Sequence, residues 1–135
     1  MRALGRLMLV LPRQLTADLE HEQRMSASEY HVLRHLSESR CGQMRMSELA
    51  QACDMSLSGM TRLAAKLEAQ GFVVRTKCEN DARGWNAVLT ERGLARLREA
   101  WPSHLASVRR HIFAHLNGLD LTKLAAALDA ITTDA

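Results

Sequence analysis

Small polar side chains and basic side chains follow one another in a single stretch near the middle of the chain. Hydroxyl groups and a helix N-terminus can donate hydrogen bonds to phosphate oxygens, and small residues let the backbone approach the edges of bases. An arginine there can bind a guanine edge or a phosphate, and a lysine one helical turn further on suits a phosphate. The residues of this stretch are Ser56, Ser58, Gly59, Thr61, Arg62 and Lys66. They indicate contact with a nucleic acid, although each alone also fits a capped helix start with solvated charges.

The next stretch changes from a helical to a strand-like period. Residues 72–76 and 87–89 are predicted to form two strands, and the polar residues 79–84 between them a long hairpin tip. Its basic residues are Arg75, Lys77 and Arg83. Arg83 precedes a glycine, so it would be a short basic projection able to enter a minor groove, and Asp81 could orient it through a charge-assisted bond.

Two pairs of histidines have the i, i+4 spacing of one helix face, His31 with His35 and His111 with His115. Such a pair can supply two imidazoles to a metal ion. No cysteine or acid stands at a spacing that would complete a familiar ligand set, so we assign no metal ligand and no cofactor. A metal-sensing role stays open as an alternative.

The three cysteines, Cys41, Cys53 and Cys78, show no CxxC spacing and so indicate neither a disulfide framework nor a zinc knuckle. Cys53 lies in an apolar helical context and is expected to be a small core residue. Cys41 and Cys78 fall in predicted loop or strand positions, where a redox switch is a second alternative.

Residue patterns typical of enzymes are missing from the sequence. There is no glycine-rich phosphate loop, no nucleophile elbow and no HExxH motif. Glu20, His21 and Glu22 are adjacent, but neighbours on a helix point in different directions and do not form an acid–base pair. We therefore expect that the chain is not an enzyme.

The composition indicates one mainly helical domain. With 135 residues, 47% apolar and 24% charged, the chain can bury a core of its own, and only 2 prolines and 7 glycines favour helices. The net charge of +3 is weak support for a polyanionic partner. No apolar run approaches the roughly 20 residues that cross a bilayer. Because a signal-peptide cleavage site is also lacking, we expect a cytoplasmic protein without membrane contact.

Apolar residues recur with helical spacing through most of the chain. The predicted helices are 2–21, 26–38, 47–54, 58–70, 90–116 and 119–133. Residues that favour helix N-termini mark their starts, namely Ser26 with Ser28, Ser47, Ser58 and Thr90. Gly71 is placed to turn the chain left-handed after the fourth helix, and residues 40–43 form a connector. Pro12 and Pro102 are expected to kink or divide the first and fifth helices.

A helix, a short helix, a turn, a longer helix and a hairpin, in this order, define a winged helix-turn-helix. We therefore predict a mainly α fold with a two-stranded β-wing, in a single domain over residues 1–135. The DNA-binding lobe spans residues 27–90, and residues 1–25 and 91–135 form dimerisation helices. Ser47, at the start of the short helix, is expected to join the polar and basic residues named above in contacting double-stranded DNA.

Five short motifs give the chain a resemblance to a known family. They are Met46-Ser-Glu-Leu-Ala50, Ser58-Gly-Met-Thr-Arg-Leu63, Leu67-Glu-Ala-Gln-Gly71, Asp81-Ala-Arg-Gly84 and Val88-Leu-Thr90-Glu-Arg-Gly93. In their order and spacing they resemble the MarR family of bacterial transcription regulators, over essentially the whole chain. The resemblance implies a homodimer with interlocking terminal helices and a recognition helix in each major groove of a palindrome. It also implies an acid-x-Arg wing tip at the minor groove, here Asp81 and Arg83. Ala82 stands between them, where many members have a second basic residue.

Family members usually repress transcription, and they often release DNA when a small aromatic or anionic compound binds between the dimerisation helices and the DNA-binding lobe. The resemblance makes Tyr30, His31, Arg34 and His35 candidate ligand contacts. Some members sense zinc through histidines on the second and fifth helices, which keeps the metal alternative open.

The terminal helices support a dimer independently of the resemblance. Helices 2–21 and 119–133 carry apolar stripes far in sequence from the wing, and a lobe of residues 27–90 cannot bury both. Packing of both helices on their own lobe as a monomer is the less favoured arrangement. A twofold dimer would place its reading helices about one DNA turn, roughly 34 Å, apart.

The sequence as a whole predicts a sequence-specific DNA-binding transcription regulator, a repressor released from a palindromic operator by a small aromatic or anionic ligand. A metal- or redox-sensing regulator with the same fold is one alternative. A winged-helix module that binds proteins and never contacts DNA is the other.

The wing assignment can be tested with Arg83→Ala, which we expect to weaken binding to most duplexes by a similar factor, because a wing-tip arginine contributes mainly charge. Substitution of Ser58 or Arg62 should instead change sequence preference. Affinities for a panel of duplexes, measured by fluorescence anisotropy over a range of salt concentrations, distinguish the two effects. Unchanged affinity and salt dependence in Arg83→Ala would refute the wing assignment.

Overall fold

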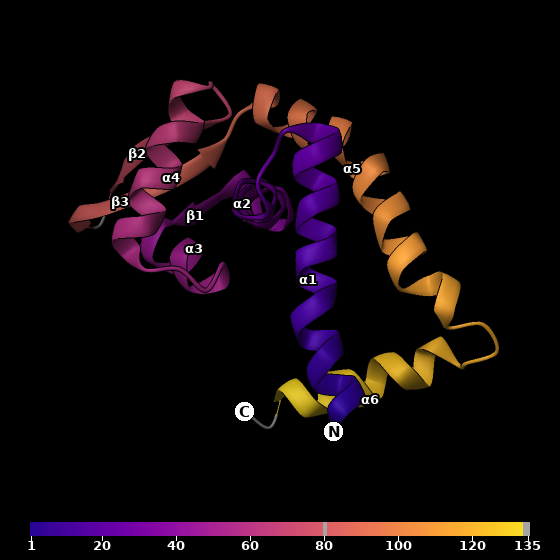
Figure 1. The fold of residues 1–135 in the computed structure, drawn as a ribbon. Coiled ribbons are helices and arrows are strands. Elements are labelled where there is room, and N and C mark those ends of the chain that lie inside the picture. The colour runs from indigo at the N-terminus through magenta and orange to yellow at the C-terminus, as the bar shows by residue number, and fades with distance from the viewer. Residues whose placement is uncertain (80, 134–135) are drawn as a thin grey trace.

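A computed structural model of the chain describes residues 1–79 and 81–133, apart from the side chains of residues 81–83. The elements are α1 (Arg2–Gln23), α2 (Ala27–Glu38), η1 (Arg40–Gly42), β1 (Gln43–Arg45), α3 (Met46–Ala52), α4 (Leu57–Ala69), β2 (Val73–Cys78), β3 (Asp81–Leu89), α5 (Glu91–His111), η2 (Phe113–His115) and α6 (Leu121–Thr133). The segment from α2 to β3 forms a lobe, and the long helices α1 and α5 extend from it towards α6 (Figure 1). This arrangement confirms the predicted mainly α fold with a β-wing.

The core of the lobe lies where α2 meets α3, α4 and the sheet. Tyr30, Val32, Leu33 and Leu36 of α2 are almost completely buried, because their spacing puts them on the faces of the helix that meet other elements. They pack with side chains from the other elements of the lobe, including Leu49, Met60, Ala64, Leu67, Val73 and Ala87. This cluster fixes the position of α4 against the rest of the lobe.

The sheet has three antiparallel strands in the order β1-β3-β2, one more strand than predicted. Residues 40–43 were expected to be a connector, but the chain from Gln43 to Arg45 pairs with β3, with Met44 opposite Ala87. Three residues are too few to show a strand period in the sequence, and this strand exists through pairing with residues far away in the chain.

Helix starts agree with the sequence where the cap is local. Ser26 Oγ accepts a hydrogen bond from the N–H of Glu29 at 3.1 Å, and Glu29 Oε2 accepts one from the N–H of Ser26 at 3.0 Å, which completes a capping box. Thr90 caps α5 as predicted, since its Oγ1 accepts from the N–H of Gly93 at 3.0 Å. Neither Pro12 nor Pro102 divides its helix. The prediction that the fifth helix reaches residue 116 is wrong, because α5 ends at His111 and η2 follows.

The start of α5 lies against the turn that follows α4. Thr90 Oγ1 donates a hydrogen bond to the carbonyl of Gly71 at 2.7 Å, and Gly71 has the left-handed φ of +78° predicted for it. A Cβ atom at Gly93 would lie 2.1 Å from the carbonyl oxygen of Phe72. Only glycine therefore lets α5 approach the lobe this closely. The start of the long helix α5 is thereby joined to the turn that follows α4.

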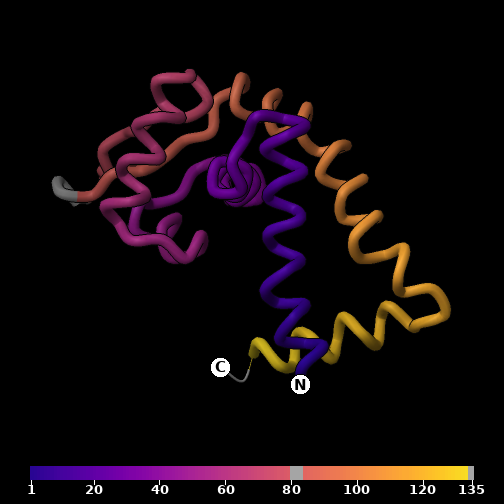
Figure 2. Tube along the Cα trace, viewed as in Figure 1, coloured from indigo at the N-terminus to yellow at the C-terminus, as the bar shows by residue number. Residues whose placement is uncertain are grey.

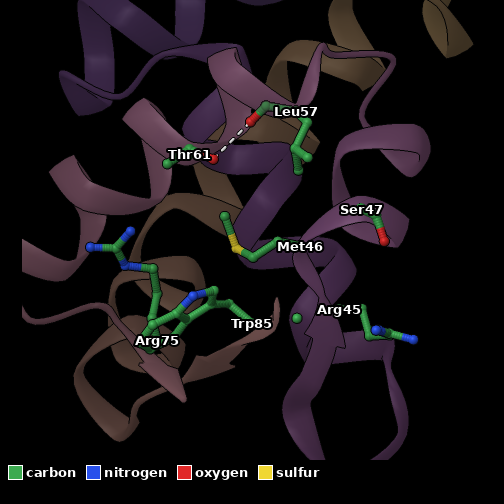
Figure 3. A pocket seen from close by; sticks show the side chains of 8 residues that line it. Arg45, Met46, Ser47, Leu57, Thr61, Arg75 and Trp85 are labelled. Atoms are coloured by element: carbon green, nitrogen blue, oxygen red, sulfur yellow. Dashed lines mark hydrogen bonds between the residues drawn. The ribbon is translucent and has the colours of Figure 1, made fainter. Parts of the chain in front are cut away.

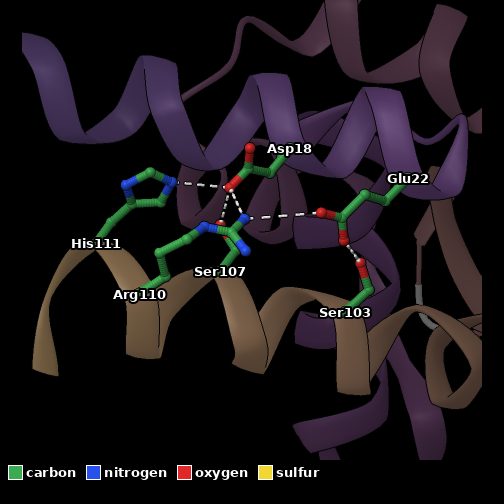
Figure 4. Close-up of polar contacts among 6 residues, drawn as sticks. All are labelled: Asp18, Glu22, Ser103, Ser107, Arg110 and His111. Atoms are coloured by element: carbon green, nitrogen blue, oxygen red, sulfur yellow. Dashed lines mark hydrogen bonds and ion pairs between the residues drawn. The ribbon is translucent and has the colours of Figure 1, made fainter. Parts of the chain in front are cut away.

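Asp18 joins α1 to α5 through three polar contacts (Figure 4). Its Oδ2 accepts hydrogen bonds from Ser107 Oγ at 2.5 Å, from Arg110 Nη2 at 2.7 Å and from His111 Nε2 at 2.8 Å. The hydrogen bond from Ser107 and then the Arg110 guanidinium lower the pKa of Asp18 from 3.8 to about 2. His111, considered above as a metal ligand with His115, thus contacts a carboxylate on α1.

Apolar side chains remain exposed on the segments that lie at the end of the molecule far from the lobe, whose backbone Figure 2 traces. They lie on the first half of α1 and on α6, and include Leu4, Leu7, Met8, Leu121, Leu128 and Ile131. No residue of α6 is buried. Among the described residues, no helix combines the length and the apolar character needed to cross a membrane.

The Asp18 contacts predict a pH-dependent stability. Because the folded-state pKa is lower than in the unfolded chain, the stabilisation is complete above about pH 4 and is lost as pH falls through about 2. We expect Asp18→Asn to lower the melting temperature at pH 7, and the difference from the unsubstituted protein to shrink between pH 4 and pH 2.

Thermal unfolding followed by circular dichroism at one protein concentration would measure this effect. Glu20→Gln, at an exposed position of the same helix, is the matched control and should show little difference at any pH. A difference for Asp18→Asn that does not depend on pH would contradict the assignment.

Candidate functional site

The N-terminus of α4 begins at a different serine from the one predicted. Ser56, not Ser58, is the N-cap, and its Oγ accepts a hydrogen bond from the N–H of Gly59 at 3.1 Å. Either serine satisfies the sequence rule for an N-cap. An apolar residue in the first turn normally points to the protein core, but Leu57 is 55% exposed and so does not mark the start of α4. Ser58 lies in the first turn with its Oγ 3.3 Å from that of Ser56.

The two sides of α4 differ in chemistry. Met60, Ala64 and Leu67 are buried in the core of the lobe, whereas Ser58, Thr61 and Arg62 are exposed. Thr61 Oγ1 donates a hydrogen bond to the carbonyl of Leu57 at 2.8 Å, so its oxygen keeps lone pairs for an external donor. The predicted polar residues therefore lie together at the open end of a helix whose other side is firmly packed.

A cleft of about 330 Å³ lies between α3, α4 and the wing (Figure 3). It brings together three predicted site residues, Ser47, Thr61 and Arg75. Its other lining residues are Arg45, Met46, Leu57, Gly84 and Trp85. Ser47 was predicted to cap α3, but Arg45 occupies the cap position and Ser47 lies exposed in the first turn.

Trp85 is the residue of this surface that sequence reasoning missed. Its side chain is 44% exposed, and Lys77, opposite it in the hairpin, places Nζ 5.7 Å from the centre of the ring. A large exposed aromatic ring beside predicted DNA contacts was the available signal. Lys77 thus lies on the wing as expected. The side chains of Asp81 and Arg83 fall outside the described residues, so the predicted wing-tip contact remains a prediction.

Two of the predicted basic contacts have carboxylate partners within the chain. Lys66 forms an ion pair with Glu29 of α2. Glu68 of α4 accepts hydrogen bonds from the N–H of Arg75 at 3.0 Å and from its Nη2 at 3.2 Å. The Arg75 side chain, followed by its N–H, lowers the pKa of Glu68. Lys66 and Arg75 therefore differ from Arg62, which has no acidic partner within salt-bridge distance among the side chains that the structure describes.

A second cleft, of about 240 Å³, lies between α2 and α5. It contains two of the four predicted ligand contacts, Tyr30 and Arg34. Sequence reasoning missed the rest of its lining, which consists of Ser37, Glu38, Leu97, Arg98 and Trp101. His31 and His35 do not line it, since His31 lies exposed on another side of α2. A tryptophan in the apolar stripe of the fifth helix was the signal that could have identified the cleft.

Polar atoms beside this cleft are buried without partners. The Tyr30 hydroxyl and His104 Nδ1 have no hydrogen-bond partner among the described residues, and the two rings lie 4.5 Å apart. Burial lowers the pKa of His104, which favours its neutral imidazole. Burial raises the pKa of the Tyr30 hydroxyl, which stays protonated and able to donate. Neutral donors and acceptors thus adjoin the arginines of the cleft.

The metal and redox alternatives gain no geometric support in the part of the chain that the structure describes. No three residues among histidine, cysteine, aspartate and glutamate there are arranged to hold a metal ion. Cys53 packs against the core, as expected, and burial raises the pKa of its thiol. Cys41 is exposed, and the half-buried Cys78 Sγ donates a hydrogen bond to Asn86 Oδ1 at 3.1 Å.

Comparison with known proteins finds similarity along almost the whole chain. The model of the MarR family matches residues 25–84. The crystal structure of AbsC, a MarR family transcriptional regulator from Streptomyces coelicolor, is 40% identical, with a TM-score of 0.83 over 98% of this chain and 92% of AbsC. Sco3205, another MarR family regulator of that organism, solved in complex with DNA, is 30% identical with a TM-score of 0.86, over 97% of this chain and 82% of Sco3205.

A curated relative matches part of the chain. The transcriptional repressor MprA of Escherichia coli is 41% identical over 56 residues, which are 42% of this chain. The match spans 32% of MprA, so the chain covers about a third of the length of that relative.

The cap assignment separates the two serines of α4 in a stability measurement. We expect Ser56→Ala to lower the free energy of unfolding by about 1 kcal/mol, because the N–H of Gly59 loses its acceptor. Ser58→Ala should stay within about 0.5 kcal/mol of the unsubstituted protein, as surface substitutions do. Denaturant unfolding at one protein concentration measures both. A larger loss in Ser58→Ala than in Ser56→Ala would reverse the assignment.

Proposed function

The chain belongs to the MarR family and is a DNA-binding transcription regulator, and on this premise we propose that it is a homodimeric repressor released from its operator by a small ligand. Its similarity to AbsC and Sco3205 extends over almost the whole chain, the terminal helices included. Members of the family regulate transcription and are not enzymes, in agreement with the sequence. The repressor role is supported by the match of 56 residues to the transcriptional repressor MprA.

The observation that carries the proposed DNA interface is the exposed polar N-terminus of α4 beside the wing. Ser58, Thr61 and Arg62 face outwards while the opposite side of the helix is buried, so the helix can enter a major groove without losing its packing. Ser47 lies in the same cleft as Thr61. The proposed contacts are Ser47, Ser56, Ser58, Gly59, Thr61, Arg62, Lys77, Asp81 and Arg83.

The exposed apolar residues of α1 and α6 support the proposed dimer. Leu4, Leu7 and Met8 would lose contact with water if a second copy covered the first half of α1, and so would the apolar residues of α6. Symmetric dimers are the commonest assemblies of soluble proteins, and a palindromic operator matches their twofold axis. The two α4 helices would then read adjacent major grooves.

The cleft between α2 and α5 supports binding of an aromatic anion. Trp101 and Tyr30 offer ring surfaces, and Arg34 and Arg98 offer guanidinium groups that can bind a carboxylate in bidentate geometry. Because α5 continues towards the proposed dimer helices, a ligand between α2 and α5 would alter the angle at which each lobe is held. That change would move the two recognition helices out of register with the operator.

The proposal is tested by selecting genomic fragments that bind the full chain and mapping the protected sequence by footprinting. We expect a palindrome bound by two chains per duplex, with affinity falling roughly ten- to a thousandfold between 50 and 200 mM salt. Arg62→Met should reduce the slope of log affinity against log salt by about 1.8, because two bound chains lose one cation each. Arg109→Met, at an exposed position of α5, is the control and should leave the slope unchanged.

The same complex then tests release. Aromatic carboxylates should displace the unsubstituted protein from the selected duplex and should displace Arg34→Met less effectively. Release by peroxide or by a chelator would instead favour the redox or metal alternative. Failure to bind any duplex in a salt-dependent manner would leave the protein-binding module as the better account.

A further inference from the structure

We propose that Lys66 and Arg75 are positioning residues that fix the orientation of α4 through carboxylates of the chain, and that they do not neutralise DNA phosphates. This inference rests on the proposed DNA interface, because it concerns how the recognition helix is held there. The sequence places these two basic residues among the DNA contacts. The inference gives them a different role in the same function.

The Lys66 contact satisfies a buried charge. The side chain of Glu29 is 8% exposed, and its Oε2 is occupied by the N–H of Ser26 in the capping box of α2. Its Oε1 is buried and receives no hydrogen bond from any other described residue, so the ammonium group of Lys66 is the group that faces it. A buried carboxylate oxygen without a cation or donor is costly. Glu29 therefore holds the ammonium group of Lys66 at α2, although the Lys66 side chain as a whole is 60% exposed.

The Arg75 contact uses both the main chain and the side chain. Glu68 accepts the N–H of Arg75 with one carboxylate oxygen and the guanidinium with the other. A carboxylate that bridges backbone and side chain in this way fixes the start of β2 relative to the last turns of α4. The guanidinium is engaged there and is only partly exposed, at 30%.

The two ion pairs hold α4 from two directions. Lys66 and Glu68 are two positions apart, so they leave the helix on different sides, one towards α2 and the other towards β2. Apolar packing alone tolerates small rotations and slides of a helix, whereas a pair of directional contacts to different elements restricts both. Both pairs lie in the second half of α4, and the first half, with Ser58, Thr61 and Arg62, remains free to contact DNA at a fixed angle.

Glu29→Gln is the most discriminating variant because the two roles of Lys66 predict opposite results. If Lys66 positions α4, the neutral amide no longer holds the ammonium group, and affinity for the selected duplex falls by on the order of tenfold, within the coupling range of contacting pairs. If Lys66 instead contacts a phosphate, removing the competing carboxylate leaves affinity unchanged or raises it.

The salt slope provides the second measurement, for Lys66→Met, Lys66→Arg and Arg75→Met. We expect Lys66→Met and Arg75→Met to weaken binding while the slope of log affinity against log salt stays that of the unsubstituted protein. Lys66→Arg, which keeps the cation, should retain most of the affinity. A slope reduced by about 1.8 in Lys66→Met or Arg75→Met, as in Arg62→Met, would overturn the proposal for that residue.

Separate control experiments test folding and DNA binding. Circular dichroism establishes that each variant is folded at the assay temperature, and the isosteric Glu68→Gln repeats the Arg75 test in a form that keeps an acceptor for the backbone N–H. Unchanged affinity in both Glu29→Gln and Glu68→Gln would also overturn the proposal. Absence of salt-dependent duplex binding by the unsubstituted protein would instead refute the proposed function itself, so the two failures are distinguishable.

Discussion

The proposed recognition helix α4 has to be packed firmly on one side and left exposed on the other, and the core of the lobe meets this requirement. Met60, Ala64 and Leu67 supply the buried side, and removing such a side chain from a core typically costs about 2–5 kcal/mol for a leucine or methionine. The free N–H groups of the first turn supply the other side, together with small hydroxyl residues that do not screen them. Space is limited at the N-terminus of α4, since a Cβ atom at Gly59 would lie 3.1 Å from the capping oxygen of Ser56.

The lobe is also connected to the long helices α1 and α5, and two sets of polar contacts make this connection. Thr90 fastens the start of α5 to the turn that ends α4, where Gly93 permits the close approach to Phe72. Further along, Asp18 holds α5 to α1. Both ends of α5 are thus attached by directional contacts, and the ligand release proposed above requires that a displacement of α5 at the cleft between α2 and α5 pass through these contacts.

The sequence was informative where structure depends on neighbours along the chain. The helix start at Ser26, the cap of Thr90 and the left-handed Gly71 are decided within a few residues, and all three were predicted, although the capping box between Ser26 and Glu29 was not. The strand β1 depends on pairing with β3, and the α2–α5 cleft depends on Trp101 and Arg98 meeting Tyr30 from a distant helix. The prediction that α4 starts at Ser58 failed for another reason, because the exposed Leu57 after the true N-cap Ser56 gives the helix start a misleading apolar signal.

The same distinction explains why the basic residues of α4 could not be sorted from the sequence. Arg62 and Lys66 are one helical turn apart and look equivalent as cations for a polyanion. What separates them is a carboxylate more than thirty positions earlier, which the capping box of α2 has already drawn into the protein interior. A carboxylate that is only 8% exposed competes with phosphate for the nearest cation, because it is poorly hydrated. At the proposed interface, the positive charge of α4 that is available to DNA is therefore smaller than the number of its basic residues, and Arg62 supplies it.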